Sequence, residues 1–245
     1  ILDWVLPAVV ARVGVEPIAE ESEELRLQLL ELAVECLKTF PHDVGPRNFL
    51  DFYKVLLENC LKDPYPDLKK LACNACVAIC NTDPKRVKHL TTPLAKVVKN
   101  NCLQHKHSSV RVAAVEAFKI LLSHGAVELL GDTKDEQDNR TSVYYLFILC
   151  SDHTESVRKA TVELLGAVLL DITERMDQHR RLLPHVILLL TDASERIRQQ
   201  ANSVMFQMGK LHMMDNEDNS INVEKRRITL KDIEWYGEDE YPSME

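Results

Sequence analysis

An all-α superhelix of about five helical-hairpin repeats is the fold class that the sequence predicts, on three observations. Only seven of the 245 residues are glycine, and Leu, Ala, Glu and Lys, which favour helices, dominate the periodic segments. A short sequence marker recurs every 40 to 47 residues. Apolar residues after each marker follow the spacing of one helical face, so the chain is expected to stack pairs of helices.

The marker consists of an acidic residue, four further residues, an aliphatic residue and then Arg or Lys. Its copies are Glu20/Leu25/Arg26, Asp63/Leu68/Lys69, Asp152/Val157/Arg158 and Asp192/Ile197/Arg198, with His105/Val110/Arg111 as a copy that lacks the acid. The aliphatic residues are 43, 42, 47 and 40 positions apart, which is the length of a two-helix repeat. Aspartate at a junction favours a turn and a helix start, because its carboxylate accepts hydrogen bonds from backbone amides.

Each marker is therefore expected to begin the second helix of a pair. The expected pairs are residues 2–13 with 23–39, 47–61 with 67–81, 85–100 with 108–123, 140–150 with 155–171, and 178–191 with 195–210. Pro7, Pro93 and Pro184 fall in or near first helices, where proline starts or bends a helix. In the fourth pair, Val157, Leu164, Leu165 and Val168 share one face, which must be buried.

The repeats are expected to cover residues 1–210, and residues 211–245 are expected to form a polar, acidic linker or tail. The chain opens on an apolar run at Ile1 without an initiator Met, so we expect an excerpt of a longer array. The charged insert at 131–139 should be a loop. No stretch has the roughly 18 apolar residues of a membrane span and no signal-peptide pattern is present, so no membrane contact is expected.

The cysteines point to a reducing compartment and to the core rather than to a metal. Seven thiols, an odd number, lie mostly in apolar runs, which favours a cytoplasmic location. Cys73, Cys76 and Cys80 form C-x-x-C-x-x-x-C, a spacing that also fits zinc. Their offsets place them on one helical face, and no second C-x-x-C exists, so core packing is expected. His105 and His107 are expected to lie in a surface turn.

The absence of catalytic motifs argues against an enzyme. The sequence has no Gly-rich phosphate loop, nucleophile elbow or H-E-x-x-H, and no paired carboxylates in a recognisable acid/base setting. We therefore expect no catalytic residue, cofactor or metal site. The arginines after the turns, among them Arg158 and Arg198, are expected to be structural: such an arginine can pair with a turn carboxylate, as Asp152 and Asp192 would permit.

The net charge of −8 is unevenly distributed, and residues 62–119 form a basic segment with 11 basic and 4 acidic residues. Such a segment can attract nucleic acid or an acidic protein, or it can simply be a solvated face. It contains few aromatic residues for base stacking, which argues against nucleic acid. Within it, Lys85, Arg86 and Lys88 start an expected helix, where the dipole disfavours positive charge by about 0.3–1 kcal/mol. We expect these three residues to form a protein-docking surface.

The combination of an acidic turn residue, an aliphatic residue, an arginine and a proline in the preceding helix resembles the HEAT repeat over residues 1–210. Three runs, at 63–79, 107–125 and 182–201, further resemble dynein axonemal assembly factors of the HEAT-repeat type. The resemblance implies a cytoplasmic, non-catalytic scaffold that helps to preassemble the dynein arms of motile cilia. It also implies protein partners: axonemal dynein chains, other dynein assembly factors and chaperone machinery.

Two other functions stay open from the residues alone. The basic segment could serve an adaptor that binds RNA or an acidic partner, and nucleic-acid binding would then weaken steeply with added salt. The chain could also be a regulatory subunit of a phosphatase or kinase complex, because a solenoid fold serves many kinds of partner.

Overall fold

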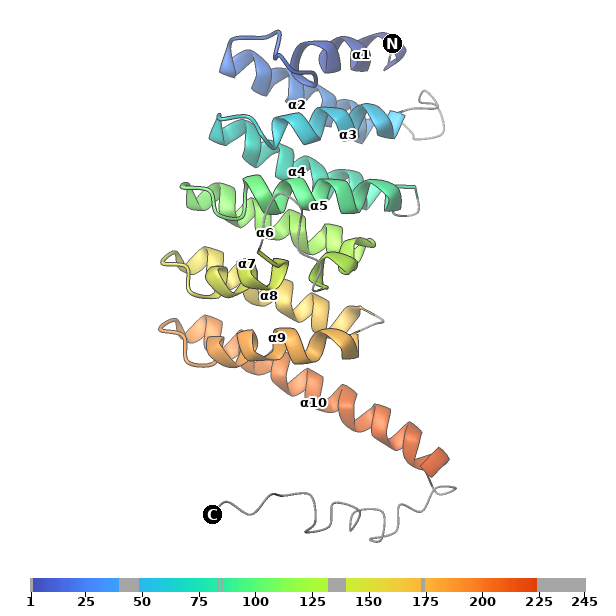
Figure 1. Cartoon of the computed structure of the whole chain (residues 1–245), viewed down its shortest axis with the longest axis vertical. Helices are drawn as coiled ribbons and strands as arrows, with labels where there is room; N and C mark the ends of the chain where they lie inside the picture. The colour runs from blue at the N-terminus through green and yellow to red at the C-terminus, as the bar shows by residue number, and fades with distance from the viewer. Residues whose placement is uncertain are drawn as a thin grey trace, which may run out of the picture. The chain divides into compact units, whose positions relative to one another are not determined.

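Helical pairs account for nearly all of the described chain (Figure 1). The computed structural model describes residues 2–39, 49–82, 84, 86–131, 140–172 and 175–223. The elements are α1 (Leu2–Val13), α2 (Glu23–Thr39), α3 (Phe49–Cys60), α4 (Pro66–Thr82), α5 (Lys88–Asn101), α6 (Ser108–Ser123), the 3₁₀-helix η1 (Ala126–Leu130), α7 (Ser142–Cys150), α8 (Glu155–Asp171), α9 (Arg175–Leu189) and α10 (Glu195–Val223). Two compact units are present, Ile1–Val204 and Met205–Glu245.

In the unit Ile1–Val204 the helices form two layers, as the expected pairing requires. The second helices of successive pairs, α2, α4, α6 and α8, contact one another in that order (Figure 1). In the other layer α1 contacts α3, α3 contacts α5, and α7 contacts α9. Every pair thereby covers the apolar face of its neighbour, which is how a helical-repeat superhelix builds its core. The predicted all-α superhelix is confirmed.

The aliphatic residues of four of the five markers lie in this core, whereas the fifth, Leu25, is 47% exposed. Leu68, Val110, Val157 and Ile197 are fully buried, and so is Leu165 on the same face of α8 as Val157. Small residues let adjacent second helices approach closely. At Gly166 in α8, an added Cβ would lie 3.0 Å from the side chain of Val204, so even alanine would crowd this contact.

A short 3₁₀-helix that the sequence did not indicate fills the outer layer between the third and fourth pairs. The helix η1 packs against α5, α6 and α7, with Ala126 and Leu130 fully buried. It is held from α9 by Arg181, whose Nη1 donates to the backbone oxygen of Leu130 at 3.0 Å. Gly125, at φ +125°, makes the turn that leads from α6 into η1. The 47-residue spacing therefore reflects η1 as well as the loop expected at 131–139, of which 132–139 lie outside the described residues.

The last helix differs from the expected one at its end. The sequence predicts a helix over 195–210, whereas α10 continues to Val223. The mixture of polar and apolar residues after Lys210 lacks the apolar period of a packed face, but nothing in it breaks a helix before Val223. The acidic end of the predicted tail, 224–245, lies outside the described residues. None of the helices that the structure describes is both long and apolar enough to cross a membrane.

Candidate protein-binding surfaces

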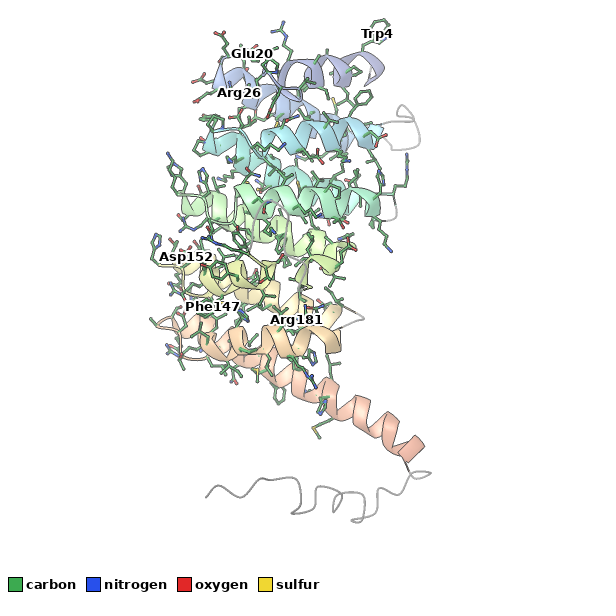
Figure 2. The ribbon with its side chains drawn as sticks, in the orientation of Figure 1. Trp4, Glu20, Arg26, Phe147, Asp152 and Arg181 are labelled. Atoms are coloured by element: carbon green, nitrogen blue, oxygen red, sulfur yellow. The ribbon has the colours of Figure 1, made fainter. Side chains whose placement is uncertain are left out.

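An arginine–aspartate ladder joins repeats at the edge where each first helix turns into its second, where Figure 2 labels two of its members, Arg26 and Asp152. In each rung, the arginine Nε and Nη2 donate to the two carboxylate oxygens of the aspartate in the following repeat. The rungs and their N···O distances are Arg26–Asp63 (2.9 and 3.2 Å), Arg111–Asp152 (2.7 and 2.9 Å) and Arg158–Asp192 (2.6 and 3.0 Å). Bidentate pairing of this kind fixes the geometry of both side chains.

The arginine and the aspartate also hold their own turns. Arg158 Nη1 donates to the backbone oxygen of Asp152 at 2.7 Å, and Arg198 does the same to Asp192 at 2.7 Å. Asp152 Oδ1 in turn accepts the backbone N–H of Thr154 at 2.8 Å. Arg158 thus donates a hydrogen bond to the backbone oxygen of Asp152, whereas its ion-pair partner is Asp192, the aspartate of the next repeat. The ladder therefore fixes the distance between repeats as well as the shape of each turn.

The ladder shifts the pKa values of its members in the directions that pairing requires. The Arg158 guanidinium lowers the pKa of Asp192, and Asp192 in turn raises the pKa of Arg158. Burial alone would raise the pKa of Asp152, but the hydrogen bonds from Arg111 and from the backbone of Thr154 outweigh it and lower the pKa. These carboxylates are therefore held ionised, which suits a structural role and not proton transfer.

The rung between the second and third repeats is built differently, because Lys69 stands in place of the arginine and His105 stands in place of the aspartate. Lys69 is buried, and its Nζ donates to the backbone oxygens of Leu61 at 2.9 Å and Asn101 at 3.2 Å. Its charge thereby neutralises the negative ends of α3 and α5. His105 Nδ1 accepts the backbone N–H of His107 at 3.2 Å, as the turn aspartates do in their turns. Burial and the nearby Lys69 lower the pKa of His105.

The cysteines of the C-x-x-C-x-x-x-C run lie in the core. Cys73, Cys76 and Cys80 are buried on α4 and carry free thiols. Burial raises the pKa of Cys80 to about 12, so this thiol is neutral at physiological pH. Among the described residues, no group of three or more His, Cys, Asp and Glu side chains is placed to hold a metal ion.

The expected docking residues Lys85, Arg86 and Lys88 precede and begin α5. Arg86 and Lys88 are exposed, and Lys85 lies outside the described residues. Lys88 has a packing role that the sequence did not indicate. A Cβ added to Gly125 would lie 3.2 Å from Lys88 Cγ, so the lysine stem covers the turn that leads into η1. The position of Lys88 at a helix start is thus explained in part by this packing.

Part of the basic segment is buried and does not contribute to the surface. Lys69 and Lys99 are buried, and Lys99 Nζ lies 5.8 Å from the ring centroid of Tyr145. The exposed lysines are divided among the turn after α3, helices α4 and α5, and the turn before α6: Lys62, Lys70, Lys88, Lys96 and Lys106. A phosphate backbone needs a continuous row of cations, so this scatter disfavours a nucleic-acid groove.

An apolar surface on α7 and α9 is the feature that sequence reasoning missed; we name it the α7–α9 outer patch. It consists of Tyr144, Phe147, Ile187 and Leu188, which are 40% to 53% exposed. The ring centroids of Phe147, labelled in Figure 2, and His185 lie 6.1 Å apart with the rings edge-on, which links the two helices. Arg140 lies over the ring of Tyr144 at 5.3 Å. The signal in the sequence was the run SVYYLFILC, which is apolar on every side of a helix, not on one face.

The fold is shared with solved helical-repeat proteins of low sequence identity. A designed armadillo repeat protein in complex with the peptide (KR)4 has a TM-score of 0.58 and 15% identity, over 84% of this chain and 81% of that one. An engineered protein, Northeast Structural Genomics Consortium target OR329, has a TM-score of 0.59 and 16% identity, over 84% and 79% of the two chains. At this identity the likeness concerns the fold alone.

Similar sequences give the family. Proteins named Dynein axonemal assembly factor 5 are 26% identical in Xenopus laevis and 28% identical in Mus musculus and Homo sapiens, over 88% to 89% of this chain. The chain spans about a quarter of the length of these relatives, 24% in each. The family described as "Dynein axonemal assembly factor 5-like, TPR repeats" matches residues 1–221. With a match over nearly all of its repeats, the chain belongs to the dynein axonemal assembly factor 5-like family.

Proposed function

We propose that the chain is a non-catalytic protein-interaction scaffold that assists the cytoplasmic preassembly of axonemal dynein arms in motile cilia. Its relatives are named for dynein assembly, and its helices stack into a regular series of repeats. The partners in this proposal are axonemal dynein chains, other assembly factors and chaperone machinery. The observation that carries the binding role is the α7–α9 outer patch, because exposed aromatic and aliphatic side chains on two adjacent helices are typical of protein-binding sites.

The charge around this patch indicates the chemistry of its partner. Residues 140–151 and 178–191 contain no Asp or Glu but include Arg140, Arg180 and Arg181. Asp152 and Asp192, which line one pocket together with Leu188, are paired with Arg111 and Arg158. A partner segment with apolar anchors between acidic residues would complement this surface. We assign the patch to an acidic, apolar segment of an axonemal dynein chain.

The test is co-precipitation of axonemal dynein heavy chains from extracts of ciliated cells, with the variant Phe147→Ser/Leu188→Ser. Both residues are at least 40% exposed, so the variant should keep its helicity and melting temperature. Recovery of dynein heavy chains should fall at least about tenfold, equal to roughly 1.4 kcal/mol of binding free energy. Val55→Ser on α3, which removes another exposed aliphatic residue away from the patch, is the matched control.

The expected docking role of Lys85, Arg86 and Lys88 is tested in the same assay. The triple reversal to Glu removes positive charge from the start of α5, so helicity should be unchanged or slightly higher. A loss of dynein recovery in the triple variant but not in the patch variant would place docking at α5. Full recovery in both variants would contradict both assignments.

A further inference from the structure

The interface between the second and third repeats encloses a pair of buried thiols beside Lys69. Cys73 lies one helical turn after Lys69 on α4, and Cys102 directly follows α5. Both cysteines are 0% exposed and carry free thiols. The two thiols are hydrogen-bonded to each other, so they form a contact between one repeat and the next.

The same place holds a buried cation. Lys69 Nζ donates to the backbone oxygen of Leu61 at 2.9 Å, and the Cys102 thiol donates to that same oxygen at 3.6 Å. Lys69 Nζ also donates to the backbone oxygen of Asn101, the residue before Cys102, at 3.2 Å. The hydrogen bond from Cys73 and the charge of Lys69 outweigh burial and lower the pKa of Cys102. The hydrogen bond to Cys102 and burial raise the pKa of Cys73. The pair therefore combines a thiol that is easily ionised with one that stays protonated.

The equivalent positions of the other interfaces hold at most one thiol. Cys73 lies four residues after its marker lysine, and Cys102 lies eight residues before the aliphatic residue of its marker, Val110. The residues with these offsets at the interfaces that have an arginine–aspartate rung, all at most 1% exposed, are Leu30 with Cys60, Val115 with Leu149, and Val162 with Leu189. In the described repeats, thiols thus occupy both positions only where the rung is replaced by Lys69 and His105.

We propose that Cys73 and Cys102 are a redox-active dithiol, which hydrogen peroxide oxidises to a disulfide that joins the second and third repeats covalently. The Cys102 thiolate attacks one peroxide oxygen, the O–O bond breaks, and the departing hydroxide takes up the proton that Cys102 released. Cys73 then attacks the sulfur of the Cys102 sulfenic acid, so the S–S bond forms, the S–O bond breaks, and a second water leaves with the Cys73 proton. The two thiols lose two electrons and the peroxide gains them.

Burial of the pair determines which oxidant can react and what the bond does. Because both residues are fully buried, the oxidant must be small enough to enter during a local opening of the repeats, and hydrogen peroxide is. The disulfide closes the loop between α4 and the end of α5, which restricts the unfolded chain. A thiol reductant reverses the bond, so the connection between these repeats follows the redox state.

The test is peptide mapping of the 245-residue chain after brief exposure to hydrogen peroxide, with free thiols blocked by N-ethylmaleimide in denaturant. Trypsin releases Cys73 in the peptide 71–85 and Cys102 in the peptide 100–106. We expect these two peptides to be linked through Cys73, with Cys76 and Cys80 of the first peptide blocked by maleimide. Cys76→Ala, which removes another fully buried thiol of α4, should still form the link, whereas Cys73→Ala should not.

Thermal melts give a second measurement that needs no variant. The oxidised chain should melt at least about 5 °C above the reduced chain, and dithiothreitol should restore the lower value. Failure of the two thiols to react, a link from Cys102 to Cys76 or Cys80, or oxidation to sulfinic acid without a linked peptide would each overturn the proposal. A melting temperature that falls on formation of the link would overturn the role of the disulfide as a connection between repeats.

Discussion

The rung between Arg111 and Asp152 provides a quantitative test of how the repeats are held together. Both side chains are at most 8% exposed, and Arg111 makes two bonds to the Asp152 carboxylate and two to its own turn. Removal of one partner from a buried ion pair costs about 3–5 kcal/mol, because the other charge stays buried. We expect Arg111→Ala and Asp152→Ala each to lower the free energy of unfolding by about 3 kcal/mol.

The double variant isolates the interaction energy between Arg111 and Asp152 from the contribution of each residue's other contacts. Because neither charge remains, the free energy of unfolding of Arg111→Ala/Asp152→Ala should fall by less than the sum of the losses in the two single variants. The difference should be about 1–3 kcal/mol. Urea unfolding followed by circular dichroism gives the free energy of unfolding of the parent chain, the two single variants and the double variant. The exposed pair Arg12–Glu20 is the control, with an expected coupling below about 1 kcal/mol. Additive effects at Arg111 and Asp152 would refute the view that the ladder couples adjacent repeats.

Three further predictions concern the irregular rung, the core and a buried histidine. Restoring a regular rung with Lys69→Arg/His105→Asp should raise the melting temperature above that of either single variant, by about 2–4 °C per kcal/mol gained. Leu165→Asp, which buries a charge at a fully covered position, should abolish the cooperative thermal transition. Burial lowers the pKa of His185 below 6.5. The unfolded state then binds more protons below pH 6.5, so stability should fall on acidification, and less so in His185→Phe, as thermal melts at about pH 7 and pH 5 would show.

The repeat pattern could be predicted from the sequence because each marker combines an aliphatic residue that packs in the core with a residue that closes a turn. Leu68, Val110, Val157 and Ile197 recur at the spacing of a helical pair and fill the core, so one set of positions determined both the period and the buried face. The turn aspartates signalled where second helices begin, since a short carboxylate closes a turn on its own backbone. Local chemistry of this kind can be read without a structure.

The contacts between repeats could not be read in the same way. Nothing in the marker says whether Arg158 pairs with Asp152 or Asp192, because both lie within reach of its chain and only the stacking distance selects the second. Lys69 looked like a member of a basic surface, yet it is buried under two helix ends. Phe147 and Leu188 lie in apolar runs whose exposure depends on the neighbouring helices. Those features depend on tertiary packing rather than on local sequence.

Binding of an axonemal dynein chain at the α7–α9 outer patch can be detected by site-specific photo-crosslinking. A photoreactive phenylalanine analogue would replace Phe147, which is 53% exposed, in one protein and exposed Lys96 on α5 in a control. After irradiation in extracts of ciliated cells, crosslinked proteins would be identified by mass spectrometry. We predict crosslinks from the Phe147 position, but not from the Lys96 position, to an axonemal dynein chain at an acidic, apolar segment. Dynein crosslinks from the Lys96 position alone, or from neither position, would contradict this role of the patch.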